Sequence, residues 1–170
     1  MNVTLTNRTR PEAYRGLDFG ENANWRQEER VSFPHCRRCI TDRVQELGKL
    51  DDNWDGYGAK PISPAMIAAV RQFLERLEDE HGELLLKPGT ETDCLVPHCG
   101  ARSSGTVQLE WQIENRILEL EFEKPDEIRY LKWWPGHAVA DEEESYPASD
   151  LAQSASLIRW VLTGDDSSAQ

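Results

Sequence analysis

The chain has 170 residues, 38% of them hydrophobic and 29% charged, and its formal net charge is −12 at pH 7. This length suits one domain, and no apolar run is long enough to span a membrane. Residues 1–50 carry nine Lys/Arg against seven Asp/Glu, a net charge of +2, so residues 51–170 carry −14. Because an acidic surface repels phosphate groups, we expect no direct nucleic-acid binding by this acidic body.

The first residues, Met1–Thr6, do not combine a basic region with an apolar one, so they do not resemble a signal peptide. We therefore predict a cytoplasmic protein. Residues 1–34 are rich in Thr, Asn, Gly and Pro and have no sustained periodicity, which predicts an irregular N-terminal arm. Several large apolar side chains suggest that part of the arm packs on the domain or on a partner: Tyr14, Leu17, Phe19, Trp25, Val31 and Phe33.

Two helices are predicted in the first half of the chain. Apolar residues at helical spacing predict a helix near 38–49. A second helix over 63–81 has Ser63 as its cap and Pro64 at its first position, where the missing N–H of proline costs nothing. Gly82 is the expected terminator of this helix.

Residues 51–59, Asp-Asp-Asn-Trp-Asp-Gly-Tyr-Gly-Ala, are the strongest turn signal in the chain. Gly56 and Gly58 admit backbone conformations that are closed to other residues. We expect the Asp side chains to cap backbone N–H groups, while Trp54 and Tyr57 fill the core. The predicted structural loop consists of Trp54, Asp55, Gly56, Tyr57 and Gly58.

The same segment matches the opening of a calcium loop, D-x-N-x-D-G, through Asp51, Asn53 and Asp55. Ile62, however, stands where such a loop needs a bidentate Glu. A small metal-binding protein or enzyme that uses the Asp51–Asp55 loop or a Cys-rich zinc site is the alternative hypothesis for function.

Residues 94–133 predict an antiparallel β-meander of three to four strands. The first strand is expected at 94–96, and the last at 128–133. Between them, apolar and polar residues alternate over 107–113 and 118–123, which places one face of the sheet in water. The predicted wet face carries four glutamates: Glu110, Glu119, Glu121 and Glu123.

Residues 135–147 are expected to form a loop that carries the acidic run 141–144. A helix over 149–162 follows, and the small polar residues 164–170 predict a flexible tail. The predicted fold class is therefore α+β, with the meander packed against two or three helices in a single domain, residues 35–163.

The order Trp-Asp-Gly-Tyr-Gly-Ala over 54–59, then a Pro-started helix, then a meander that contains Leu109-Glu110-Trp111, resembles a widespread group of small bacterial proteins. These proteins are often carried by phages and mobile elements. The resemblance covers residues 40–162 and implies the same order of elements and a bacterial origin. It implies no catalytic residues, because the group has no established activity.

We expect no cofactor, although the cysteines offer a candidate zinc site. Cys36 and Cys39 have the two-residue spacing of a zinc knuckle, and Cys94 and Cys99 form a looser second pair. Four thiolates, or three and the imidazole of a neighbouring histidine (His35 or His98), would complete a tetrahedral site, so these four cysteines are the candidate metal ligands. The alternative is four separate cytosolic thiols.

Catalytic motifs are lacking, since the sequence contains no G-x-S-x-G, no H-E-x-x-H and no phosphate-binding loop. The glutamates of the meander are an alternative pair of glycosidase carboxylates, but alternation places them on the solvent face. We therefore predict no catalytic residues and favour a protein that is not an enzyme.

We predict instead a module that binds a basic surface of another protein, as an accessory subunit or inhibitor in a mobile-element, defence or toxin–antitoxin setting. Acidic residues on a sheet can imitate a phosphate backbone. Trp133 and Trp134 are adjacent, so in a strand they point to opposite faces, and one of them is a candidate interface anchor. The predicted partner-binding residues are Glu119, Glu121, Glu123, Trp133, Trp134, Glu142 and Glu143.

Overall fold

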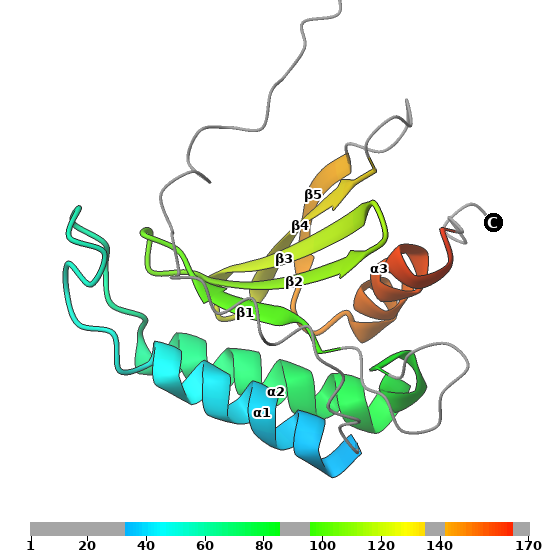
Figure 1. The fold of residues 1–170 in the computed structure, drawn as a ribbon, viewed down its shortest axis with the longest axis horizontal. Coiled ribbons are helices and arrows are strands. Elements are labelled where there is room, and N and C mark those ends of the chain that lie inside the picture. The colour runs from blue at the N-terminus through cyan, green and yellow to red at the C-terminus, as the bar shows by residue number, and fades with distance from the viewer. Residues whose placement is uncertain (1–32, 86–95, 135–141, 165–170) are drawn as a thin grey trace, which may run out of the picture.

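The computed structural model describes residues 33–85, 96–134 and 142–164, so most of the predicted arm and of the predicted tail lies outside the described residues (Figure 1). The elements in chain order are α1 (Phe33–Leu47), α2 (Pro64–His81), the 3-10 helix η3 (Gly82–Leu85), β1 (His98–Ala101), β2 (Val107–Ile113), β3 (Arg116–Lys124), β4 (Glu127–Trp133), β5 (Glu142–Pro147) and α3 (Leu151–Thr163).

The five strands form one antiparallel sheet in the order β1-β2-β3-β4-β5. The predicted α+β meander is confirmed, with one strand more than the upper limit of the prediction. The described helices lie together on one face of this sheet (Figure 1). We call this side the inner face and the opposite side the outer face. Helix α3 contacts β2 and β3, while α1 contacts α2 and the edge strand β1.

Helix α2 begins as the sequence predicts. The Ser63 hydroxyl accepts a hydrogen bond from the Met66 N–H at 3.1 Å, and proline occupies the first position of the helix. As predicted, α2 ends at His81 with Gly82 as its C-cap, but the φ of Gly82 is right-handed, at −56°, and the chain continues into η3. This extra turn brings Leu84, 8% exposed, into the core.

The other two helices differ from their predicted ranges by a few residues. Helix α1 starts at Phe33, inside the predicted arm, and ends at Leu47. Helix α3 is capped by Asp150, whose carboxylate accepts a hydrogen bond from the Gln153 N–H at 3.0 Å. It ends at Gly164, which is left-handed with φ of 80°. None of the helices in the three described ranges has the length and the apolar character needed to cross a membrane.

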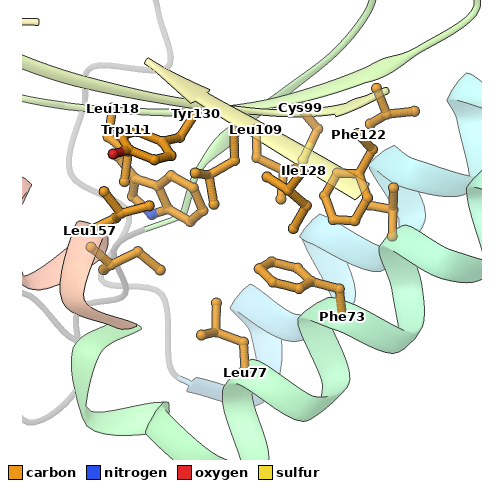
Figure 2. Packing of buried hydrophobic residues seen from close by; sticks show 14 of the residues in the cluster. Phe73, Leu77, Cys99, Leu109, Trp111, Leu118, Phe122, Ile128, Tyr130 and Leu157 are labelled. Atoms are coloured by element: carbon orange, nitrogen blue, oxygen red, sulfur yellow. The ribbon is translucent and has the colours of Figure 1, made fainter. Parts of the chain in front are cut away.

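The hydrophobic core lies between the inner face and the helices (Figure 2). In the register of β2 and β3, Trp111 stands opposite Leu118, and both are almost fully buried. Phe73 of α2 meets Phe122 of β3 edge to face, with ring centroids 5.2 Å apart. The alternation seen in the sequence therefore marks the inner face, as expected for a sheet with one covered side.

Two strand predictions need correction. Val96 is not in a strand, and β1 begins at His98, after a proline that cannot donate a hydrogen bond to a ladder; Cys94 and Leu95 lie outside the described residues. The second half of the predicted loop 135–147 is β5, which pairs with β4. Only Tyr146 of its six residues is buried, so β5 has no hydrophobic alternation that would reveal it.

Candidate functional site

The outer face of the sheet carries the side chains that alternate with the core residues. On β3 and β4 the register pairs Glu121 with Arg129, Glu119 with Leu131, and Ile117 with Trp133. Charged residues therefore occupy one end of the outer face, and apolar residues occupy the other.

The charged end is organised around one guanidinium group. Arg129 contacts Glu121 at 2.7 Å, Glu123 at 3.3 Å and Glu143 at 3.2 Å. We call these four residues, which belong to three strands, the ionic cluster. Three carboxylates against one guanidinium leave the cluster with a net charge of −2.

Glu121 is the least exposed carboxylate of the ionic cluster, with only 13% of its side chain exposed. Burial raises the pKa of Glu121, but hydrogen bonds from Thr106 and Arg129, together with the charges of Arg102 and Arg129, outweigh it. The pKa is therefore held below its ordinary value of 4.5. The hydroxyl of Thr106 donates to this carboxylate at 2.6 Å, so Glu121 is a fixed anion rather than a solvated one.

The predicted wet row of glutamates is therefore wrong in one respect. Glu119, Glu121 and Glu123 are each half-buried, and the long side chain of Arg129 contacts the carboxylates of Glu121 and Glu123. The sequence did not reveal this pairing, since it arises from the register between β3 and β4. The role of these glutamates in binding a partner stays a prediction.

The other end of the outer face is a small apolar group, Ile117, Leu131 and Trp133, which we call the apolar corner. Ile117 is 7% exposed, and the other two are half-buried. None of the three belongs to the hydrophobic core or packs against it. Ile117 and Leu131 were missed as site residues, although alternation with the inward Ile128 and Tyr130 places Leu131 outward.

The two adjacent tryptophans lie on opposite faces, as expected from their positions. Trp134 packs against the core, and the guanidinium of Arg116 lies 5.6 Å from the centroid of its ring. Trp133 lies on the outer face, opposite Ile117. Trp133 is therefore the candidate anchor, while Trp134 belongs to the packing between the sheet and the end of α3.

The predicted site residues Glu142 and Glu143 also lie on opposite faces of the sheet. Glu143 is a member of the ionic cluster on the outer face. Glu142 is opposite Lys132 in the register and contacts its ammonium group at 2.9 Å. Lys132 is 5% exposed and lies over the ring of Trp160 at 4.8 Å, so Glu142 stabilises a buried cation beside α3.

The Trp-Asp-Gly loop has an internal network of hydrogen bonds. One carboxylate oxygen of Asp55 accepts from the N–H groups of Tyr57 at 2.8 Å and Ala59 at 3.0 Å, as expected for capping. The expectation that Tyr57 fills the core is wrong, because its side chain is 95% exposed. Trp54 is only half-buried, and the buried residues near the loop are instead Ala59 and Ile62.

In the described ranges, no group of three or more His, Cys, Asp or Glu side chains is arranged so that it could hold a metal ion. Cys99 is a free thiol that points into the core (Figure 2). Burial raises the pKa of Cys99 to about 12, which the charge of Arg43 only partly offsets, so this sulfur stays protonated.

The remaining ligands of the predicted zinc site are not tested. Cys36 and Cys39 lie on α1, and Cys94 lies outside the described residues. In the calcium half-motif, oxygens of Asn53 and Asp55 already accept backbone N–H groups. Both metal hypotheses therefore stay predictions.

Comparisons of this chain with protein-family models, with curated proteins and with solved structures gave no match. The resemblance to small bacterial and phage-borne proteins therefore rests on the motif alone and stays a prediction.

Proposed function

We propose that this protein is a non-enzymatic module that binds a basic surface of another protein through the outer face of its sheet. The observation that carries the proposal is the pairing of an apolar corner with a net-negative ionic cluster on a face that no described helix covers. In this role the protein would serve as an accessory subunit or an inhibitor. We place this function in the cytoplasm of a bacterium, in the mobile-element, defence or toxin–antitoxin setting that the motif suggests.

Charge favours a basic partner over a second copy of this chain. Two identical outer faces would bring two net-negative clusters together, which is unfavourable. A partner with Lys or Arg at its rim would instead complement the exposed carboxylate of Glu143, which is 57% exposed. Such rim charges accelerate association and make it sensitive to salt.

The apolar corner would form the part of the interface that becomes buried and loses its water when the partner binds. Tryptophan is one of the residue types enriched at the energetic centres of interfaces. Trp133 is half-buried at the end of β4, so its ring has a fixed position and retains exposed surface. The half-buried ionic cluster then forms the polar border on one side of this centre.

Site-specific cross-linking tests the proposal. A photoreactive amino acid replaces Gln112, an exposed outer-face residue opposite Ile117, and in a matched control it replaces Gln72, which is exposed on α2. Both proteins are irradiated in cells of the native host. We expect a protein to be captured from position 112 and not from position 72.

The captured protein is then purified, and its binding to the parent and to variants is measured. We expect Trp133→Ala to weaken binding by about tenfold or more. Glu143→Lys should slow association, whereas Glu75→Lys, the same charge change on α2, should have little effect. Equal capture from both positions, or binding that Trp133→Ala does not change, would contradict the proposal.

A further inference from the structure

The side chain of Tyr57 is the most exposed large hydrophobic group among the described residues, at 95%; the next is Val96, at 42%. It stands in the loop between α1 and α2. Large aromatic side chains normally bury most of their surface, because they carry a large apolar area. An aromatic ring held almost wholly in water on an ordered loop therefore needs an explanation other than packing.

The loop holds Tyr57 in place without using its ring. The Asn53 side chain accepts from the Gly58 N–H at 2.6 Å, and the Asn53 N–H donates to the Ala59 carbonyl at 2.7 Å. Asn53, Gly56 and Gly58 all have positive φ, at 61°, 76° and 92°. This closed, hydrogen-bonded backbone orders the loop that carries Tyr57 before any contact is made.

The loop is also anchored to the rest of the domain. The Trp54 indole donates to the Lys60 carbonyl at 3.2 Å, and the Lys60 N–H donates to the Ser103 carbonyl at 2.9 Å. Ala59 is 1% exposed. The loop is thus tied to the turn between β1 and β2, and Tyr57 is presented from a rigid base.

We propose that this loop is a second protein-contact surface, in which Tyr57 enters an apolar pocket of a partner whose rim carries Lys or Arg. Asp51 and Asp52 are exposed in the same loop and would complement such a rim. Tyrosine has few rotatable bonds, and an ordered loop loses little conformational entropy on binding. An arginine at the rim would also gain from contact with the face of the ring.

This surface is separate from the apolar corner of the outer-face site, although the ionic cluster lies nearer to it, because Thr106 of the turn between β1 and β2 donates to Glu121. The loop adjoins the turn between β1 and β2, whereas the apolar corner lies at the opposite end of the strands, next to the turn between β2 and β3. Figure 1 shows the loop at one end of the molecule and α3 at the other. The inference therefore does not rest on the proposed function, and the two can fail independently.

Peptide selection tests the inference without a known partner. A display library of random peptides is selected on the full-length protein, and the affinities of the recovered peptides are measured for the parent and for variants. We expect peptides enriched in Lys or Arg whose affinity falls about 30-fold with Tyr57→Ala and is kept with Tyr57→Phe. Trp133→Ala is the control for the outer-face site and should leave these affinities unchanged.

Two further measurements test whether binding needs the ordered loop as well as the Tyr57 ring itself. Gly58→Ala strains the positive φ while keeping Tyr57, so it should weaken the same peptides. Tyr57→Ala should melt at the parent's temperature, since its side chain is exposed. A lowered melting temperature of Tyr57→Ala, or recovered peptides that bind it as they bind the parent, would overturn the inference.

Discussion

The inner and outer faces of the sheet are built on the same strands, yet different interactions hold them together. On β3 the inward residues Leu118, Leu120 and Phe122 have no exposed surface and meet apolar side chains from the helices. The outward residues between them, Glu119 and Glu121, are half-buried, and Glu121 contacts Arg129. One strand therefore serves a core of apolar contacts and a surface of paired charges, because its side chains alternate.

A basic side chain from each face, Lys132 on the inner face and Arg129 on the outer face, shows how their surroundings differ. Lys132 on the inner face is 5% exposed and contacts the carboxylate of Glu142 and the ring of Trp160. Arg129 on the outer face is 38% exposed and contacts three carboxylates. The inner cation completes the packing against α3, whereas the outer cation leaves a negative charge for the surroundings.

The largest expected effect is on the inner face. Trp111→Ala removes a side chain that is 1% exposed and leaves a cavity in the core. We expect the free energy of unfolding to fall by about 3–5 kcal/mol, measured by urea denaturation. A loss below about 1 kcal/mol would mean that the inner face is not the main source of stability.

A pair of glycine variants tests how the end of α3 is held on the inner side. A Cβ atom at Gly164 would lie 2.5 Å from Arg116 Nη1, whereas one at Gly56 would meet no atom within 4 Å. Both residues have positive φ, so both alanine variants carry the same backbone strain, about 1 kcal/mol. We expect Gly164→Ala to be the more destabilising, by about a further 1–2 kcal/mol in thermal and urea unfolding. Equal losses would show that the Arg116 side chain moves away freely.

On the outer face, Glu121 should make the free energy of unfolding fall as the pH is lowered. The pKa of Glu121 is lowered in the folded protein, so its contribution is complete above the ordinary value of 4.5 and is lost as the pH falls through the folded-state value. Unfolding measured from pH about 7 to about 3 should therefore show a weaker acid-side decline in Glu121→Gln than in the parent. Glu75→Gln, on the exposed surface of α2, is the control and should follow the parent. An unchanged decline in Glu121→Gln would mean that the ionic cluster does not stabilise the fold.

The smallest expected effect on stability is that of Trp133→Ala. Its side chain lies on the outer face, apart from the core, so we expect a loss of about 1 kcal/mol or less in urea unfolding. A loss close to that of Trp111→Ala would mean that the apolar corner is part of the folded core, and it would remove Trp133 as an anchor for a partner.

Local signals in the sequence were sufficient for the elements that local interactions determine. Ser63 and Pro64 predicted the start of α2, and the two-residue alternation predicted β2 and β3 with their inward residues. The strand β5 was missed because its backbone pairing with β4, and not its side chains, makes it a strand.

The candidate site was harder to predict, because it depends on residues that meet only across strands. The three carboxylates around Arg129 lie on different strands or at different positions of one strand, and only the register brings them together. Tyr57 was expected inside because large aromatics are usually buried, but the hydrogen bonds of Asn53 and Asp55 orient this loop outward.

Among the described strands, the order leaves β5 at one edge of the sheet, where it pairs with β4. Open edges are the places where folded chains stack into aggregates, and natural proteins protect them with charge. Glu142, Glu143 and Glu144 are consecutive and exposed along β5, so two such edges would repel each other before their backbones could pair. These three glutamates, which the sequence placed in a loop and the structure places in β5, would thus hinder edge-to-edge pairing of this sheet with another copy.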